Sequence, residues 1–322
     1  MTSLPFAITG VSGYIAPRHL RAIRDTGNHL VAAVDPKDSA GVLDPFGFDI
    51  RFFTEIERFD RHLEKLRRGP DANPVRYVSV CSPNFLHDAH CRLAMRVGAD
   101  AICEKPLVIN PWNLDALQEI ELETGRRVFN VLQLRAHARL LALRQRLLEA
   151  EKRQPGVRHH VVLSYVTARG PWYLVSWKGQ KEKSGGLMID IGIHFFDMLM
   201  WLFGPVDRHH VFLNEPRRAA GHLELKRASV SWFLSVAAED LPFEVQPGVR
   251  TTFRAINVDG EEVEFSDGFT DLHTRIYEQT LAGKGFGIDE VRPAIDLVYK
   301  LRHAELSPID STAHPFAQRF AR

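Results

Sequence analysis

Short apolar runs alternate with helical patterns along the first 130 residues of the chain. Runs typical of buried strands lie at 6–9, 30–35, 51–53, 77–81, 101–103 and 128–132. Patterns with helical periodicity lie between them, at 17–25, 56–66, 85–97 and 113–124. Strands that alternate regularly with helices indicate a doubly wound parallel sheet covered on both faces.

The pattern changes after a leucine-rich helix at 137–151. Strand patterns then dominate, at 157–166, 211–212, 222–225, 229–236, 252–258 and 262–265. Apolar residues alternate along 230–236, which indicates an antiparallel sheet with one face on helices. The helix at 190–203 is the expected cover, and Asp259-Gly260 is typical of a hairpin turn. Two helical patterns, 271–281 and 289–306, precede a mixed tail at 307–322.

These patterns predict an α/β protein of two domains. Residues 1–135 form a Rossmann domain, and residues 136–322 form an α+β domain with a large, mostly antiparallel sheet. The sheet face away from the helix is expected to be open. An open apolar face favours a homo-oligomer, either a dimer or a tetramer.

Composition excludes several classes of protein. The net charge is +1, which gives no basic field for nucleic acid. The three cysteines show no CxxC spacing, and two of them fall on predicted inner strands, which fits buried thiols in a reducing compartment. The apolar stretch 187–203 is interrupted by Asp190, His194 and Asp197, and the first residues lead straight into a strand. We therefore expect a cytoplasmic protein without a membrane segment.

A glycine turn, Gly10-Val-Ser-Gly13-Tyr-Ile-Ala16, joins the first strand to the first helix. In that context, small residues let the backbone approach a pyrophosphate at the helix N-terminus. Asp35 ends the second strand, where a carboxylate accepts hydrogen bonds from a ribose 2′-hydroxyl and repels a 2′-phosphate. The motif therefore predicts NAD as cofactor, in preference to NADP.

The segment after the fourth strand supplies further candidates. Ser82 and Asn84 lie where ligands bind beyond the strand ends, although Asn84 also suits a helix cap. His87 is either a cofactor contact or a structural residue. The residues expected to bind the cofactor are Gly10, Ser12, Gly13, Tyr14, Ile15, Asp35, Ser82, Asn84, His87, Glu104, Lys105 and Gln133.

The chemistry is expected from Glu104-Lys105-Pro106 and from a helix that carries Asp190 and His194. A hydride leaves an alcohol carbon only as the hydroxyl proton is removed, so a base is needed. Lys105 ends a strand where such a base belongs, and desolvation can keep a lysine neutral. His194 is the competing base, and Asp190, four residues away, either orients it or holds a sugar hydroxyl. Asp190 and His194 offer two ligands, too few for a metal site, so none is expected.

The loop at 168–179 contains both cationic and aromatic side chains. Cations suit diphosphate and carboxylate groups, and aromatic faces suit a uracil or sugar ring, although the rings also suit packing between domains. Gln133 and Arg135 follow the sixth strand and point toward the same crevice. The residues expected to bind substrate are Lys105, Arg135, Tyr165, Arg169, Trp172, Tyr173, Lys178, Asp190 and His194.

The combination of Gly10 and Gly13, Glu104-Lys105-Pro106, and Asp190 with His194 resembles the glucose–fructose oxidoreductase / inositol 2-dehydrogenase (Gfo/Idh/MocA) family. The resemblance covers the whole chain and implies a Rossmann domain followed by an α/β domain. It also implies that Lys105 and His194 are catalytic, whereas the position of Asp190 varies among related enzymes.

Several longer segments resemble one subgroup, the UDP-N-acetyl-2-amino-2-deoxyglucuronate dehydrogenases of bacterial surface-polysaccharide and lipopolysaccharide biosynthesis. These segments are 13–28, 78–87, 130–135, 168–179, 227–236 and 267–290, the last of which contains His273. The resemblance implies oxidation of the carbon-3 hydroxyl of UDP-N-acetylglucosaminuronate (UDP-GlcNAcA) by tightly held NAD, for a partner aminotransferase. It further implies that 2-oxoglutarate regenerates NAD.

Two alternatives stay open beside this interpretation. The first is another sugar or polyol dehydrogenase of the family, which the cationic 168–179 loop disfavours because it suits an anionic substrate. The second is a dinucleotide-sensing regulator without catalysis, which the presence of Lys105 and His194 disfavours. The sequence leaves open the identity of the base, the route of NAD regeneration, the oligomer size and the role of the tail.

Overall fold

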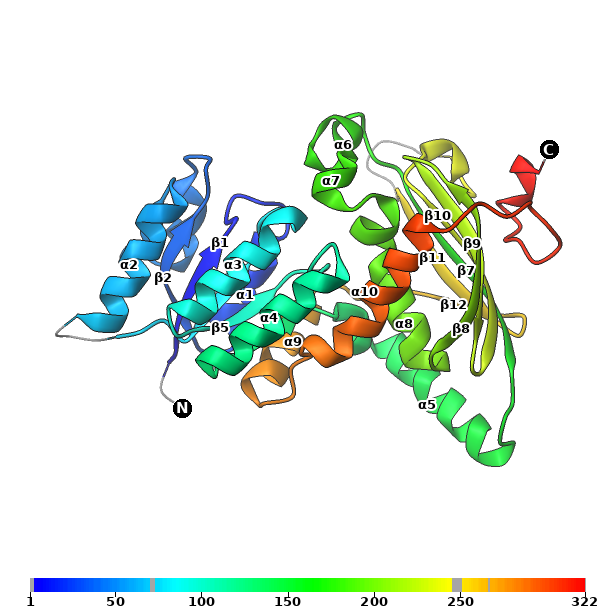
Figure 1. The fold of residues 1–322 in the computed structure, drawn as a ribbon, viewed down its shortest axis with the longest axis horizontal. Coiled ribbons are helices and arrows are strands. Elements are labelled where there is room, and N and C mark those ends of the chain that lie inside the picture. Colours follow the sequence, from blue (N-terminus) through cyan, green and yellow to red (C-terminus); the bar gives the residue numbers. More distant parts are fainter. Residues whose placement is uncertain (1–2, 70–72, 245–250, 266, 322) are drawn as a thin grey trace. The chain divides into compact units, whose positions relative to one another are not determined.

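The computed structural model describes residues 3–69, 73–244, 251–265 and 267–321, which form two compact units (Figure 1). Unit 1 comprises Met1–Gln133 and Thr270–Arg292, and unit 2 comprises Leu134–Phe269 and Pro293–Arg322. The sequence places one boundary after residue 135. The structure divides the chain two residues earlier and also groups Thr270–Arg292 with the first unit.

Unit 1 is built on a parallel sheet of six strands in the order β3-β2-β1-β4-β5-β6. The strands are β1 (Pro5–Thr9), β2 (His29–Val34), β3 (Arg51–Phe53), β4 (Tyr77–Val80), β5 (Asp100–Cys103) and β6 (Val128–Asn130). All five residues of β1 are buried, as expected for a strand that is covered on both faces of the sheet, and such strands have nearly continuous apolar sequences. The strand order is that of a doubly wound dinucleotide-binding fold, so the Rossmann prediction is confirmed.

The α-helices that lie wholly within the described part of unit 1 are α1 (Ala16–Asp25), α2 (Ile56–Arg68), α3 (His87–Arg96), α4 (Pro111–Thr124) and α9 (Leu272–Leu281). Helix α9 comes from the late part of the chain and packs against α1. The sequence analysis assigns the α9 pattern to the second domain. Its place beside α1 brings side chains from residues 272–281 to the parallel sheet.

Unit 2 is built on a mixed sheet of six strands in the order β12-β11-β7-β10-β9-β8. The strands are β7 (His159–Thr167), β8 (Val206–Asn214), β9 (Arg218–Leu225), β10 (Ala228–Ser235), β11 (Thr252–Val258) and β12 (Glu261–Glu264). Among the described strands, β7 and β10 pair in parallel and the other neighbours pair antiparallel, so the sheet is mostly antiparallel, as predicted. Asp259 and Gly260 both have positive φ angles, of 53° and 90°, as the predicted hairpin between β11 and β12 requires.

Helices α5 (Ala138–Arg153), α6 (Trp172–Val175), α7 (Lys181–Ser184) and α8 (Ile193–Phe203) belong to unit 2, whereas α10 (Ile288–His303) begins in unit 1. Helix α8 covers one face of the mixed sheet, where the ring of Phe196 lies 5.1 Å from that of Trp232. The segment Lys181–Phe203 is long enough to cross a membrane, and it contains an 18-residue window with a mean hydropathy of 1.5. Because 78% of that window is buried inside the protein, the segment is better explained as part of the core.

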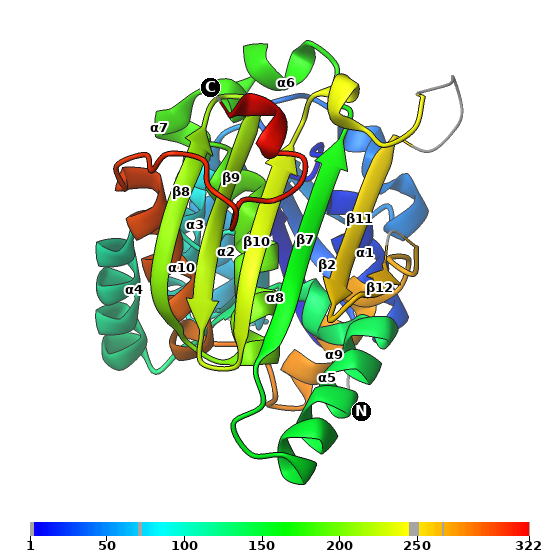
Figure 2. The same cartoon turned by 90° about the vertical axis from the view of Figure 1, so that its right-hand side faces the viewer.

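The chain after α10 crosses the other face of the mixed sheet, in front of β8, β9 and β10 in Figure 2. Ala313 and Ala317 are buried there against Phe212 and Phe233. His314 stacks on the ring of Phe233 and hydrogen-bonds the Ser164 hydroxyl at 2.8 Å. The tail therefore covers part of a face that the sequence predicts to be open.

Candidate active site

The glycine turn of unit 1 is packed closely against the end of β4. Gly10 has a φ of +73°, and a Cβ atom there would lie 2.6 Å from the Cys81 oxygen and the Ser82 nitrogen. Only glycine satisfies both constraints. The Gly10 N–H donates to the Val34 oxygen at 2.8 Å, which fixes the turn beside the end of β2. This cradle of bare backbone at the start of α1 fits the pyrophosphate of a dinucleotide.

Asp35 holds the same turn from the second strand. Its Oδ2 atom accepts a hydrogen bond from the Ser12 N–H at 3.0 Å, and its Oδ1 atom accepts one from the Lys37 N–H at 2.9 Å. The carboxylate lies directly after β2, where the sequence places the ribose contact. Gly13 continues the turn, and the adjoining Tyr14 side chain is 87% exposed.

The loops that follow β4 and β5 are tied together by His87. Its Nδ1 and Nε2 atoms lie 2.6 Å and 2.7 Å from the carbonyl oxygens of Pro106 and Ser82. Burial lowers the pKa of His87. The two contacts give the ring the structural role considered from the sequence, and its contact with the cofactor stays a prediction. Asn84 is buried in the turn before α3, and Gln133 is also buried.

His90 is a neighbouring residue that the sequence analysis does not identify. Its Nδ1 atom lies 2.8 Å from the Ser82 hydroxyl and 3.1 Å from the Thr9 hydroxyl. Burial lowers the pKa of His90 to about 4, so the ring is neutral at physiological pH. It positions Ser82, one of the expected cofactor contacts, at the carboxyl end of the sheet.

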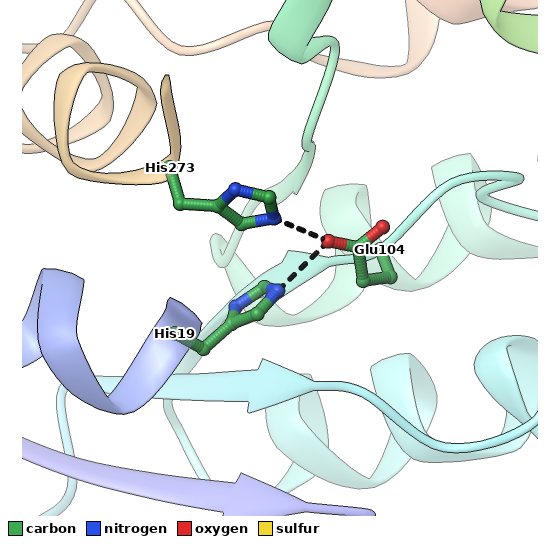
Figure 3. Close-up of side chains that lie close together, drawn as sticks. All are labelled: His19, Glu104 and His273. Atoms are coloured by element: carbon green, nitrogen blue, oxygen red, sulfur yellow. Dashed lines mark hydrogen bonds and ion pairs between the residues drawn. The ribbon is translucent and has the colours of Figure 1, made fainter. Parts of the chain in front are cut away.

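Glu104 is the centre of a buried polar network at the end of β5 (Figure 3). Its Oε1 atom accepts hydrogen bonds from the Nε2 atoms of His19, on α1, at 2.9 Å and His273, on α9, at 2.8 Å. The Lys105 N–H donates to its Oε2 atom at 3.1 Å. The carboxylate thus joins two helices to the backbone of Lys105, whose side chain is half-buried.

The network continues beyond the carboxylate. His19 Nδ1 lies 2.7 Å from the Tyr277 hydroxyl, which lies 2.6 Å from the Ser79 hydroxyl on β4. Burial alone would raise the pKa of Glu104, but the hydrogen bonds from both imidazoles hold it well below its usual range. Burial lowers the pKa of His19, so the carboxylate is charged while this imidazole is neutral.

Two imidazoles and a carboxylate are also a donor set that zinc accepts. The ligand atoms of His19, Glu104 and His273 lie within 4.8 Å of one another. Their nitrogen–oxygen distances of 2.9 Å and 2.8 Å are those of hydrogen bonds, which account for the arrangement.

Sequence reasoning names Glu104 but not His19, Tyr277 or Ser79. The one available signal is the position of His19 on the apolar face of α1, with Ala16, Leu20 and Ile23.

Unit 2 has buried carboxylates of its own, of which Asp190 is one. It lies in a π-helical turn, Met188–Gly192, that immediately precedes α8. Its Oδ1 atom accepts a hydrogen bond from Lys178 Nζ and its Oδ2 atom one from the Tyr173 hydroxyl, both at 2.9 Å. The predicted loop at 168–179 and the predicted helix therefore meet at Asp190. Because a π turn shifts the helical phase, the simple four-residue spacing to His194 does not apply. His194 is half-buried in the first turn of α8.

Another buried carboxylate of unit 2, Asp197, is held by Arg135. The guanidinium Nε and Nη2 atoms donate to its two oxygens at 2.9 Å and 2.6 Å. Burial raises the pKa of Asp197, although the Arg135 charge opposes the change. The sequence assigns Arg135 to the substrate, and this bidentate ion pair gives it a structural role in unit 2. Tyr165, another expected substrate residue, is buried with its ring 4.8 Å from that of Phe195.

Unit 2 also contains a cavity of about 290 Å³ beside the 168–179 loop. Arg169, Tyr173 and Arg217 are among the residues that line it. Trp172 is half exposed on the same loop. Two guanidinium groups beside an aromatic ring suit an anionic ligand.

Comparison with known families gives two matches along the chain. Residues 4–131 match the model of the Gfo/Idh/MocA oxidoreductase family, NAD-binding Rossmann fold. Residues 157–307 match the model of the same family's C-terminal alpha/beta domain. Together the two models cover most of the sequence, so the resemblance stated from the motifs is confirmed.

Among solved structures, the chain is similar to the WlbA (WbpB) dehydrogenase from Thermus thermophilus. The two share 50% sequence identity with a TM-score of 0.91, over 97% of this chain and 99% of the other. That protein has been crystallised with NAD and UDP-GlcNAcA, and also with NAD and alpha-ketoglutarate. The WlbA dehydrogenase from Bordetella pertussis, at 19% identity and a TM-score of 0.76 over 96% of this chain and all of that one, shares the fold.

Among curated proteins, D-glucoside 3-dehydrogenase from Escherichia coli is 32% identical over 130 residues, which are 39% of this chain and 35% of that protein. The match thus spans about a third of the relative's length.

The glycine turn at Gly10, the order of the parallel strands and the two family matches all agree. The chain belongs to the Gfo/Idh/MocA oxidoreductase family, with an NAD-binding Rossmann domain followed by the family's C-terminal α/β domain.

Proposed function

We propose that this protein is an NAD-dependent dehydrogenase that oxidises the carbon-3 hydroxyl of UDP-GlcNAcA to the 3-keto sugar. The observation that carries the proposal is the 50% identity, over 97% of this chain, to the Thermus thermophilus dehydrogenase crystallised with NAD and UDP-GlcNAcA. The anionic character of this sugar agrees with the cations Arg169 and Arg217, which line the cavity of unit 2. The same enzyme is expected to serve surface-polysaccharide biosynthesis in the cytoplasm, as a homo-oligomer.

NAD, when bound, accepts the hydride. The protein must remove the hydroxyl proton as the hydride leaves, and Lys105 and His194 are the residues proposed for this step. The backbone of Lys105 is fixed in position, because its N–H donates a hydrogen bond to the buried Glu104 carboxylate at 3.1 Å. Either a neutral lysine or a neutral imidazole can accept the proton, and the second group then stabilises the developing oxyanion.

Asp190 is proposed to receive a sugar hydroxyl or to orient His194. It is buried, and its two oxygens accept hydrogen bonds from Lys178 and from Tyr173. The fixed orientation of the carboxylate is the property that substrate positioning requires.

The cavity lined by Arg169 and Arg217 is proposed for an anionic part of a ligand. Either the diphosphate of the nucleotide sugar or the carboxylates of 2-oxoglutarate have suitable charge. The second crystal structure of the Thermus thermophilus enzyme, with NAD and alpha-ketoglutarate, supports 2-oxoglutarate as the compound that regenerates NAD.

The direct test is a coupled turnover. Purified protein incubated with UDP-GlcNAcA and 2-oxoglutarate should form the 3-keto sugar and 2-hydroxyglutarate in equal amounts. A neutral polyol such as inositol, which has no charge for the unit 2 cations, should react poorly. Turnover with inositol and none with UDP-GlcNAcA would instead support another sugar or polyol dehydrogenase of this family.

Variants of the proposed acid–base groups separate chemistry from binding. Lys105→Ala and His194→Ala should each lower kcat by about 10²- to 10⁴-fold. Both should still bind NAD, because the glycine turn and Asp35 are unchanged. The variant that removes the base should also lose the corresponding limb of the pH–rate profile. A near-normal rate in Lys105→Ala would remove that lysine from the mechanism.

A further inference from the structure

We infer that the buried carboxylate of Glu104 is a positioning residue that favours the oxidised form of the bound cofactor, so that NAD⁺ binds more tightly than NADH. His19 and His273 are the residues that keep this carboxylate in place and charged. The inference depends on the NAD binding of the family and is independent of which sugar is the substrate.

The charge on Glu104 is maintained by donors that are themselves neutral. His19 donates from Nε2 to the carboxylate, and its Nδ1 atom accepts from the Tyr277 hydroxyl at 2.7 Å. Both nitrogens of a neutral imidazole are then satisfied. Among the described residues, the other donors to the carboxylate are His273 and the Lys105 backbone N–H.

His273 is best explained as a neutral ring as well. Its Nδ1 atom is buried and has no hydrogen-bond partner among the described residues. An imidazolium would bury an unpartnered N–H donor there, whereas a neutral ring leaves only a lone pair. Leaving a donor unpaired costs about 1–3 kcal/mol, and more when the group is charged. The network as a whole therefore carries one negative charge.

No arginine or lysine side chain hydrogen-bonds or pairs with this carboxylate within residues 3–69, 73–244, 251–265 and 267–321. Glu104 is 5% exposed, so water screens its charge weakly. Burying a carboxylate without a cation is expensive, which makes the arrangement unusual for a purely structural residue. The charge remains available to act on a positive group nearby.

The position of Glu104 indicates which group that is. It follows β5 at the carboxyl edge of the parallel sheet, next to the strand that leads into Ser82. In doubly wound folds the dinucleotide binds at this edge. The nicotinamide ring is positively charged in NAD⁺ and neutral in NADH. A fixed negative charge therefore stabilises the oxidised form relative to the reduced form, and this difference appears as a ratio of affinities.

The test compares the affinities of the full-length protein for NAD⁺ and NADH, measured by calorimetry without sugar. Glu104→Gln keeps the shape of the side chain and removes the charge. It should reduce the preference for NAD⁺ over NADH by at least about tenfold. Equal weakening of both affinities would overturn the inference, because a merely structural role moves both forms alike.

Glu121→Gln is the matched control. Glu121 is a carboxylate of the same unit that accepts the Val128 N–H at 2.6 Å. Val128 begins β6, so this carboxylate lies at the opposite edge of the sheet from Glu104. The ratio of NAD⁺ to NADH affinity should be unchanged in this variant. A change as large as that of Glu104→Gln would mean that any lost carboxylate has the effect, and would overturn the inference.

A second variant tests the network if Glu104→Gln does not fold. His273→Phe removes one donor and raises the proton affinity of the carboxylate. The NAD⁺ preference of the wild type should be constant between pH 5 and 8, as expected for a Glu104 pKa well below its usual range. The preference of His273→Phe should fall as the pH is lowered. Identical, constant ratios in both proteins would overturn the assignment.

Metal analysis of the purified protein tests the competing interpretation of the same three side chains. Hydrogen-bonded imidazoles predict no metal retained in stoichiometric amount. One equivalent of zinc that remains after gel filtration, and that is lost in His273→Phe, would neutralise the Glu104 charge. That result would overturn the inference.

Discussion

The two units bury their acidic side chains in opposite ways. In unit 1, Glu104 is surrounded by neutral imidazole and backbone donors. In unit 2, Asp190 and Asp197 are each paired with a cation, Lys178 and Arg135. The first arrangement leaves a net negative charge inside the protein, whereas the other two cancel theirs.

The difference appears in the protonation of the groups. The pKa of Glu104 is lowered, because hydrogen bonds from His19 and His273 outweigh the effect of burial. The pKa of Asp197 is raised, because burial outweighs the attraction of Arg135. A buried ion pair therefore mainly fixes local structure, while a lone charge held by neutral donors influences nearby ligands.

The largest expected effect is a loss of unfolding free energy in acid. Burial lowers the pKa of His90, in unit 1, to about 4 and that of His314, in unit 2, to about 3. The unfolded chain binds these protons first as the pH falls below about 6.5, so stability is lost between that pH and the folded pKa values. Between pH 7 and pH 4, each of these two histidines should lower the unfolding free energy by about 3 kcal/mol. Urea unfolding at pH 7 and pH 4 measures the loss.

The acid response can be divided between the units. His314→Gln retains a donor for the Ser164 hydroxyl and removes the titrating ring of unit 2. Hydrogen exchange at pH 4 should then show unit 1 opening before unit 2. Simultaneous opening of both units in this variant would contradict the assignment of the acid-sensitive groups.

Loss of a cationic partner should have the next largest effect. Arg135→Met leaves Asp197 buried without its guanidinium and should cost about 3–5 kcal/mol of unfolding free energy. Urea denaturation is the measurement. The double variant Arg135→Met/Asp197→Leu should recover most of the loss, since neither charge remains. No recovery would mean that packing of the Arg135 stem, and not charge, explains the cost.

Removing a single neutral donor should cost less. Tyr173→Phe deletes the hydroxyl that donates to Asp190 at 2.9 Å and leaves the Lys178 contact. A loss of about 1–2 kcal/mol in unfolding free energy is expected. If Asp190 also positions the sugar, KM for UDP-GlcNAcA should rise more than kcat falls. An unchanged KM would argue against that role.

An exposed ion pair should matter least. Arg158 pairs with Glu224 on the surface of unit 2, with side chains 50% and 33% exposed. Arg158→Ala should cost less than about 1 kcal/mol, because water and salt screen the pair. The same urea experiment serves as the reference for Arg135→Met. A cost equal to that of Arg135→Met would show that burial does not distinguish the two ion pairs.

Local sequence patterns were enough to predict much of the site. Gly10, Asp35 and Lys105 each stand at the end of a strand or in the turn after it, so their places followed from the strand pattern alone. The pairing of Arg135 with Asp197 was missed, because the two residues lie 62 positions apart and share no periodic signal. The π turn at Asp190 was missed because its residues also fit an ordinary helical pattern.

The sequence by itself determined the two sheets, the NAD-binding turn and the family, since each depends on residues close together in the chain. Only the tertiary structure decided that α9 joins unit 1, that His19 and His273 meet at Glu104, and that the tail covers part of the mixed sheet. The physical reason is that periodicity records which face of an element is buried. It does not record which distant element covers that face, and the charge at Glu104 depends on that choice.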